Sequence, residues 1–166
     1  MMTTYKHLYI VRHGKSDRDF VDVPDYDRPL KERGIVDSYK MASILVQKKM
    51  IPQLIITSPA IRALHTAMIF ARTFKFPLKN INISEDLYLS SENKHLEIFK
   101  ETDDSIDSLM IFGHNPSFTD LANYFLHNKI EEIPTSGVVG IKFENDSWEN
   151  IAKFKPIEYF FDYPKK

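Results

Sequence analysis

Short apolar runs of strand length alternate along the chain with longer segments in which apolar residues recur every three or four positions. The short runs predict strands at Lys6–Val11, Gln53–Thr57, Leu109–Phe112, Val138–Phe143 and Trp148–Phe154. The helical spacing predicts helices at Leu30–Lys49, Pro59–Phe74, Asn93–Thr102 and Pro116–His127. Strands that alternate with helices are typical of an α/β protein, here a three-layer α/β/α sandwich with a mostly parallel central sheet and an antiparallel edge strand.

The organisation of the chain is simple. No internal repeat, low-complexity tract or long linker divides it, so residues 1–166 are expected to form a single domain, long enough to bury its own core. The last two predicted strands, joined across Glu144–Ser147, are expected to form a hairpin. The aromatic tail Ile157–Lys166 is expected to pack on the body of the domain; docking of a partner is the alternative.

The first predicted strand ends in Arg12-His13-Gly14. A histidine with an ordinary pKa is mostly neutral at pH 7, so His13 is a candidate nucleophile without an external base. The guanidinium of Arg12 carries a fixed fork of donors that suits phosphate oxygens. Gly14 is expected to let the backbone turn sharply and a ligand approach closely.

Two later strands end in a similar way. The second leads into Ser58-Pro59, interpreted as an N-cap and a first helical residue, with Arg62 in the first turn. A bound anion would relieve the conflict between the Arg62 charge and the helix dipole. The third leads into Gly113-His114-Asn115-Pro116, which places His114 next to a helix N-terminus capped by Asn115, a natural site for an anion.

These loops are expected to lie together, because the carboxyl ends of parallel strands share one edge of an open α/β sheet. Two arginines and two histidines in one pocket repel each other unless a dianion such as phosphate lies between them. The structural alternative for each residue is an exposed arginine or a histidine hydrogen-bonded to the backbone.

Taken together, the three segments resemble the histidine phosphatase superfamily, which has the phosphoglycerate-mutase-like fold. The segments that carry this resemblance are Arg12-His13-Gly14, Ser58-Pro59-x-x-Arg62-Ala63-x-x-Thr66-Ala67 and Gly113-His114. Within the superfamily the chain is most similar to the small SixA-type phosphohistidine phosphatases. That finer resemblance is carried by Asp27-Arg28-Pro29-Leu30-x-x-x-Gly34, Gly113-His114-Asn115-Pro116 and Ile133-Pro134-Thr135-Ser136-Gly137.

The resemblance implies a metal-independent phosphatase without a cofactor. His13 would accept the phosphoryl group and pass it to water, with its other ring nitrogen held by a carbonyl near Gly14. Arg12, Arg62 and His114 would bind the phosphoryl oxygens. Further contacts with the substrate are expected from Gly14, Ser16 and Asn115.

The proton donor departs from the pattern of the superfamily. Many members carry a glutamate where this chain has Leu89, in the stretch Glu85-Asp86-Leu87-Tyr88-Leu89-Ser90. Glu85 or Asp86 could substitute for this acid, and Asp25 is another candidate. An imidazole leaving group needs less protonation than an alkoxide, which favours phosphohistidine on another protein as the substrate. A phosphatase or mutase acting on small phosphomonoesters, and a non-catalytic phosphate-binding module, remain as alternatives.

Composition narrows the partners. The formal net charge of −1 indicates no general affinity for nucleic acid or anionic membranes. The absence of cysteine excludes disulfides and thiolate chemistry, and the other histidines lack metal-ligand spacing. Without an apolar signal segment or a run of membrane-spanning length, the chain is expected to be cytoplasmic. The short connection Asn82–Asp107 predicts an open site, rimmed by Asp17–Arg28 and Ile133–Gly137, that suits a protein substrate better than an enclosed metabolite.

Overall fold

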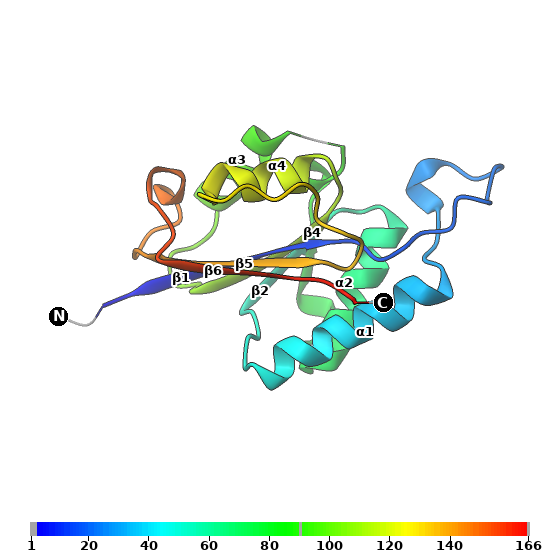
Figure 1. The fold of residues 1–166 in the computed structure, drawn as a ribbon, viewed down its shortest axis with the longest axis horizontal. Helices are drawn as coiled ribbons and strands as arrows, with labels where there is room; N and C mark the ends of the chain where they lie inside the picture. Colours follow the sequence, from blue (N-terminus) through cyan, green and yellow to red (C-terminus); the bar gives the residue numbers. More distant parts are fainter. Residues whose placement is uncertain (1–2, 90, 166) are drawn as a thin grey trace.

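Six strands form one twisted sheet in the order β3-β2-β4-β1-β5-β6 (Figure 1). The computed structural model describes residues 3–89 and 91–165. Parallel pairing joins β1 to β4, β4 to β2 and β2 to β3, whereas β5 and β6 are added as antiparallel strands. The strands are β1 Tyr5–Arg12, β2 Leu54–Thr57, β3 Ile81–Ile83, β4 Ser108–Gly113, β5 Val138–Glu144 and β6 Glu158–Asp162.

Helices cover both faces of the sheet, which confirms the predicted three-layer sandwich (Figure 1). The first pair, α1 (Glu32–Gln47) and α2 (Ile61–Phe74), lies on one face. The second pair, α3 (Glu92–Lys100) and α4 (Ser117–Phe125), lies on the other. All four helices lie within two residues of the predicted ranges at each end.

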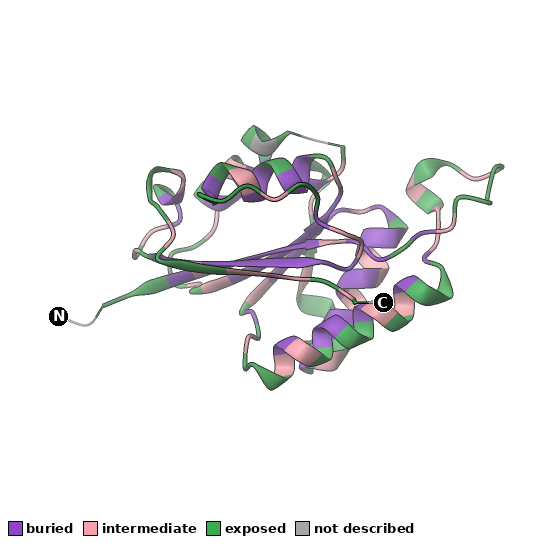
Figure 2. Cartoon of the chain, in the orientation of Figure 1, coloured by how far each residue is buried: buried purple, intermediate pink, exposed green. Residues whose placement is uncertain are grey.

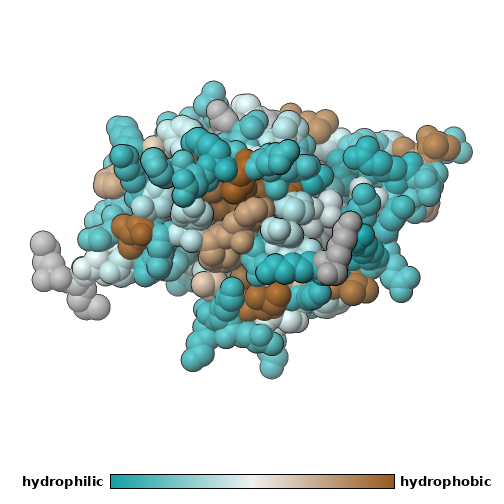
Figure 3. Space-filling view, in the orientation of Figure 1, coloured by the Kyte–Doolittle hydropathy of each residue, from teal (hydrophilic) through white to brown (hydrophobic). Residues whose placement is uncertain are grey.

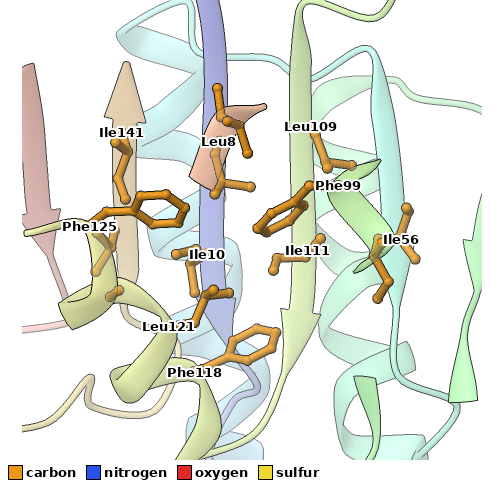
Figure 4. Close-up of a cluster of buried hydrophobic side chains, with 14 of the residues drawn as sticks. Leu8, Ile10, Ile56, Phe99, Leu109, Ile111, Phe118, Leu121, Phe125 and Ile141 are labelled. Atoms are coloured by element: carbon orange, nitrogen blue, oxygen red, sulfur yellow. The ribbon is translucent and has the colours of Figure 1, made fainter. Parts of the chain in front are cut away.

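Alternation along β1 separates the two apolar layers, because successive strand side chains point to opposite faces. Leu8 and Ile10 pack with Phe118 and the other apolar residues under α3 and α4 (Figure 4). Tyr9 and Val11 instead join the cluster under α1 and α2. The central strands are buried along most of their length (Figure 2), so the strand ends are held firmly in place.

The predicted strand Trp148–Phe154, and with it the hairpin across Glu144–Ser147, is wrong. Trp148 is fully buried, and its indole N–H donates to the carbonyl of Ile106 at 2.6 Å. The segment then forms a 3-10 turn, Ile151–Lys153. Its two buried apolar residues, Trp148 and Ile151, are three positions apart, which is the spacing of a turn rather than of a strand. The tail supplies the last strand as β6, so it packs on the domain as predicted.

Two helix caps were also predicted wrongly. Helix α2 begins at Ile61 after Ala60, and the hydroxyl of Ser58 accepts the N–H of Ala60 at 3.2 Å. Helix α4 begins at Ser117, without a side-chain cap from Asn115. In both places the X-Pro pair forms a loop that precedes the helix.

Two glycines allow α1 to lie directly against the loop that follows β1. A Cβ on Gly34 would lie 2.3 Å from the carbonyl oxygen of Lys15, and a Cβ on Gly14 would lie 2.8 Å from the carbonyl oxygen of Gly34. Neither glycine has a positive φ. Gly14 is therefore required here for contact between two backbone segments, rather than for the sharp turn expected from the sequence.

Gly34→Ala tests this contact, because the sign of the change in the free energy of unfolding shows whether the contact is tight. At an unhindered helix position the change stabilises a protein by about 1 kcal/mol. Here the added methyl group meets backbone that cannot rotate away, so we expect a loss of about 1–3 kcal/mol in the free energy of unfolding. Urea denaturation measures the change, with Ser43→Ala on the exposed side of α1 as the control. A stabilised Gly34→Ala protein would show that the contact is loose.

Candidate active site

The ends of three neighbouring strands, β2, β4 and β1, bring the candidate residues together. His13 follows β1, Ser58 follows β2 and His114 follows β4. The backbone N–H of His13 donates to the carbonyl of Gly113 at 3.1 Å, which fixes the loop after β1 to the end of β4. The ring centroids of His13 and His114 lie 5.1 Å apart. The predicted convergence of the two histidines at one edge of the sheet is therefore observed.

The tautomer of His13 is determined by its neighbours. Its Nδ1 lies 2.7 Å from the carbonyl oxygen of Gly14. Because a carbonyl oxygen only accepts hydrogen bonds, Nδ1 carries the proton and Nε2 keeps its lone pair. The N–H of Gly14 donates in turn to the hydroxyl of Thr66 at 2.9 Å, so the supporting loop is anchored to α2. His13 thus presents a deprotonated nitrogen from a fixed ring.

Burial and positive neighbours keep both rings neutral. Burial is the main cause that lowers the pKa of His13 to about 3, with further lowering by His114, Arg62 and Arg12. The hydrogen bond that His13 donates to the carbonyl of Gly14 acts in the opposite direction and raises the pKa. Burial also lowers the pKa of His114 to about 3, helped chiefly by Arg62. At pH 7 neither ring bears a charge, which is the state that a nitrogen nucleophile requires.

Arg62 is almost fully buried and is held by one residue of the loop before α1. Its Nη1 donates to the carbonyl of Asp25 at 2.8 Å, and its Nη2 to the carboxylate Oδ2 of Asp25 at 2.9 Å. Arg12 is held in a similar way, since its Nη1 donates to the carbonyl of Ile133 at 2.8 Å. Both guanidinium groups are therefore fixed by their outer nitrogens.

Three buried nitrogen atoms at this edge have no hydrogen-bond partner among the described residues: Nε of Arg12, Nε of Arg62 and Nδ1 of His114. Buried polar atoms in proteins are nearly always paired, so three such atoms, from the end of β1, from α2 and from the loop after β4, need an explanation. An oxyanion placed among them would accept from all three. The arrangement thus fits a tetrahedral anion such as phosphate.

Ser58 explains why Nδ1 of His114 is the available nitrogen. The hydroxyl of Ser58 lies 2.8 Å from Nε2 of His114 and already accepts the N–H of Ala60. Its own proton can therefore be donated to Nε2, which leaves the ring proton on Nδ1. Ser58, expected only to cap a helix, instead orients the second histidine.

The expected substrate-contacting side chains are occupied within the protein. The hydroxyl of Ser16 accepts from Nη1 of Arg28 at 2.7 Å. The amide of Asn115 donates to Ile133 at 3.0 Å and accepts from Thr119 at 2.9 Å. Their contact with a substrate, like that of Gly14, stays a prediction.

Two of the candidate proton donors, Asp25 and Glu85, lie in one network of contacts beside Arg62. Burial raises the pKa of Asp25, but hydrogen bonds from Tyr88, Arg62 and Arg28 outweigh it and hold that pKa well below its usual range. The hydroxyl of Tyr88 donates to Asp25 at 2.7 Å. Glu85 accepts the hydroxyl of Tyr26, whose ring packs against Tyr88. Asp25 in this state is an acceptor of hydrogen bonds and holds no proton to donate.

Sequence reasoning did not identify Arg28 and Tyr88 as residues of the site. Nε of Arg28 donates to Asp25 at 3.0 Å, and the ring of Tyr88 packs edge-on against His114 at 5.5 Å. Arg28 was visible only as part of a motif, and Tyr88 only as the neighbour of Leu89. Tyr88 also donates to Asp25, which lies 63 residues away, and a contact across that separation leaves no local pattern in the sequence.

A cavity of about 440 Å³ opens beside His114, lined by Leu89, Asn93, Asn115 and Asp120 among others. It has room for the group that carries a phosphate. Within residues 3–89 and 91–165, no group of three or more His, Asp or Glu side chains could hold a metal ion.

Comparison with known proteins shows what this chain resembles. The model of the histidine phosphatase superfamily (branch 1) matches residues 8–88. An uncharacterised chloroplastic protein of Arabidopsis thaliana is 28% identical over 152 residues, which span 87% of this chain and 69% of that protein. These matches show that the chain is similar to the histidine phosphatase superfamily, which is the resemblance that the sequence motifs predict.

Solved structures show the same fold. The protein histidine phosphatase SixA in complex with tungstate superposes with a TM-score of 0.79 at 19% identity, over 93% of this chain and 96% of that one. A structure from Agrobacterium tumefaciens, provisionally assigned as a SixA phosphohistidine phosphatase, gives 0.79 at 21% identity, over 96% and 99%. A mycobacterial glucosyl-3-phosphoglycerate phosphatase gives 0.67 at 13% identity, over 95% and 97%.

Among the described residues, no helix is both long enough and apolar enough to cross a membrane. The cytoplasmic location stays a prediction.

The buried neutral histidines predict a pH-dependent stability. The pKa values of His13 and His114 are about 3 and that of His95 is about 4, whereas histidines in an unfolded chain titrate near pH 6.5. Between these pH values the unfolded state binds more protons, so the free energy of unfolding falls as the pH is lowered from 7 to 5. The slope is at most about 1.4 kcal/mol per pH unit for each such histidine.

Urea denaturation at pH 7, 6 and 5 measures this slope. His114→Gln removes one titrating ring and is expected to give a shallower slope than the wild type, while the exposed control His127→Gln keeps the wild-type slope. A His114→Gln protein with an unchanged slope would mean that His114 takes up its proton equally in the folded and unfolded states, and that its pKa is not lowered by folding.

Proposed function

We propose that the protein is a metal-independent phosphatase that transfers a phosphoryl group to Nε2 of His13 and then to water. The observation that carries this proposal is the pairing of a neutral, tautomer-fixed imidazole with three unpartnered buried nitrogens at the same edge of the sheet. A binding module would gain little from a nucleophile held in this way. Catalysis is therefore favoured over simple phosphate binding.

The chemistry requires positioning and positive charge around the transferring group. The lone pair of Nε2 forms a bond to phosphorus, and the bond between phosphorus and the leaving atom breaks with its electron pair on that atom. Water then attacks the phosphoryl group, and the electron pair of the P–N bond returns to Nε2. Arg12, Arg62 and His114 stabilise charge on the phosphoryl oxygens in both steps, as preorganised donors do in phosphoryl transfer.

The substrate that best suits the site is phosphohistidine on another protein. The position of the usual acid is occupied by Leu89, whose side chain is exposed, and Asp25 is held in its charged form. Such a site favours a leaving group that departs without protonation at the scissile atom. In phosphohistidine the scissile nitrogen has no free lone pair to protonate, and the proton sits on the other ring nitrogen.

The surroundings of the site support a protein-sized substrate. The loop between β1 and α1 projects from the body of the molecule (Figure 1). Apolar atoms lie at the tip of this projection (Figure 3), and two apolar residues of the same loop, Phe20 and Val21, are exposed. A carrier protein could rest on this projection while it presents a phosphorylated side chain. The SixA structures, which share the fold, are named for this class of substrate.

His13→Ala tests the nucleophile. With a phosphohistidine peptide as substrate, we expect phosphate release to fall by roughly a thousandfold or more, because no other group replaces the attacking nitrogen. The covalent phosphoenzyme, trapped by quenching without acid, should disappear in the same variant. His127→Ala, an exposed histidine, is the control. Turnover by His13→Ala at the wild-type rate would overturn the proposed mechanism.

A panel of substrates tests the leaving group. Wild-type enzyme in a chelator is expected to hydrolyse phosphohistidine faster than phosphomonoesters such as p-nitrophenyl phosphate, and vanadate or tungstate should inhibit both reactions. Faster hydrolysis of small phosphate esters would instead support the small-molecule alternative. Tungstate binding without any phosphoenzyme would support the binding module.

A further inference from the structure

We infer that Asp25 is a positioning residue, which holds Arg62 so that the buried Nε of Arg62 points at the phosphoryl group. We also infer that Asp25 is not the proton donor. This inference rests on the phosphoryl site of the proposed function but not on the identity of its substrate. It reassigns a residue that the sequence offers as an acid.

Asp25 determines the orientation of the Arg62 guanidinium group. Arg62 leaves only 4% of its surface exposed, so its guanidinium has lost most of its water. Asp25 contacts both outer nitrogens, through its carbonyl at 2.8 Å and its carboxylate at 2.9 Å. Two bonds to two nitrogens of a planar group fix the plane of that group and leave Nε on the opposite side. That Nε is one of the three unpartnered nitrogens.

Asp25 is itself held in place from two further directions. Arg28 donates to its Oδ1 at 3.0 Å, and the hydroxyl of Tyr88 donates to its Oδ2 at 2.7 Å. Arg28 belongs to the same loop, whereas Tyr88 lies beyond β3 and packs against His114. A carboxylate fixed on three sides can determine the orientation of a long side chain.

The same contacts disfavour an acid. All three donors stabilise the charged carboxylate, whereas a general acid must hold a proton at the working pH. The charge of Asp25 also repels a bound phosphoryl dianion. Positioning and charge therefore act on anion binding with opposite signs, and this opposition allows an experiment to separate them.

Binding of inorganic tungstate to the intact protein, measured by calorimetry, is the first test. Asp25→Ala removes the repelling charge together with the carboxylate contact to Arg62, and we expect about tenfold weaker binding because the lost position outweighs the removed repulsion. Asp25→Asn keeps an oxygen that can accept from Arg62, and we expect binding at least as tight as in the wild type. Asp22→Asn, an exposed carboxylate of the same loop, is the control.

Leaving-group dependence is the second test. We compare hydrolysis of phenyl phosphate and of p-nitrophenyl phosphate, whose leaving group needs no acid. A positioning role predicts that Asp25→Ala lowers kcat/KM for both by the same factor and that Asp25→Asn restores most of the activity. A general acid predicts that both variants lose activity equally, and that the loss is confined to phenyl phosphate.

The outcomes distinguish a failure of the positioning role from a failure of the proposed function. If the wild type binds tungstate and Asp25→Ala binds it equally or more tightly, the positioning role is wrong and the proposed function stands. Selective loss on phenyl phosphate in both variants also overturns the positioning role. If the wild type does not bind tungstate, the phosphoryl site itself is wrong, and the proposed function fails with the inference.

Discussion

The burial of one guanidinium group and two imidazoles, beside a second guanidinium group that is partly buried, at one edge of the sheet is the constraint on which the rest of this structure depends. Charges of one sign are costly to bring together away from water, and no single interaction removes that cost. In this structure several groups reduce that electrostatic cost. The two imidazoles stay uncharged, a carboxylate and main-chain carbonyls satisfy the outer guanidinium nitrogens, and three inner nitrogens remain for a ligand. Without a tetrahedral oxyanion the arrangement has no evident advantage, so the site indicates its ligand through what it leaves unsatisfied.

The parts of this arrangement that the sequence reveals are those that local patterns encode. An apolar run that stops at Arg12-His13 shows both the strand and the polar pair at its end, and the same holds for His114. Arg62 was visible as a cation in the first turn of the helix after the second strand, and the superfamily motifs include the same residue. The strand predicted at Trp148–Phe154 failed because a run of apolar and aromatic residues does not show whether its spacing suits a strand or a turn. The short strand β3 was missed because three residues, mostly exposed, carry too little pattern.

The network above Arg62 lay beyond sequence reasoning for a different reason. Asp25, Arg62 and Tyr88 come from three segments that are distant in the sequence, and each contact depends on a rotamer rather than on a spacing. Reading Asp25 as an acid was reasonable from its residue type alone. Its three donors change that interpretation, since a residue type fixes which protonation states are available and its neighbours select among them.

The pairing of β1 with β4 has a consequence for how such proteins can diversify. Arg12 lies opposite Gly113 in the ladder, and each of the two histidines is the next residue along its own strand. The spacing between the two rings is thus set by main-chain pairing of the two strands and depends little on the surrounding loops. Insertions in those loops, or new residues around the neighbouring cavity, can change which molecule carries the phosphate. The positions of the two histidines proposed to contact the phosphate would stay the same. A scaffold of this kind separates recognition from chemistry, which makes it a suitable starting point for redesigning specificity.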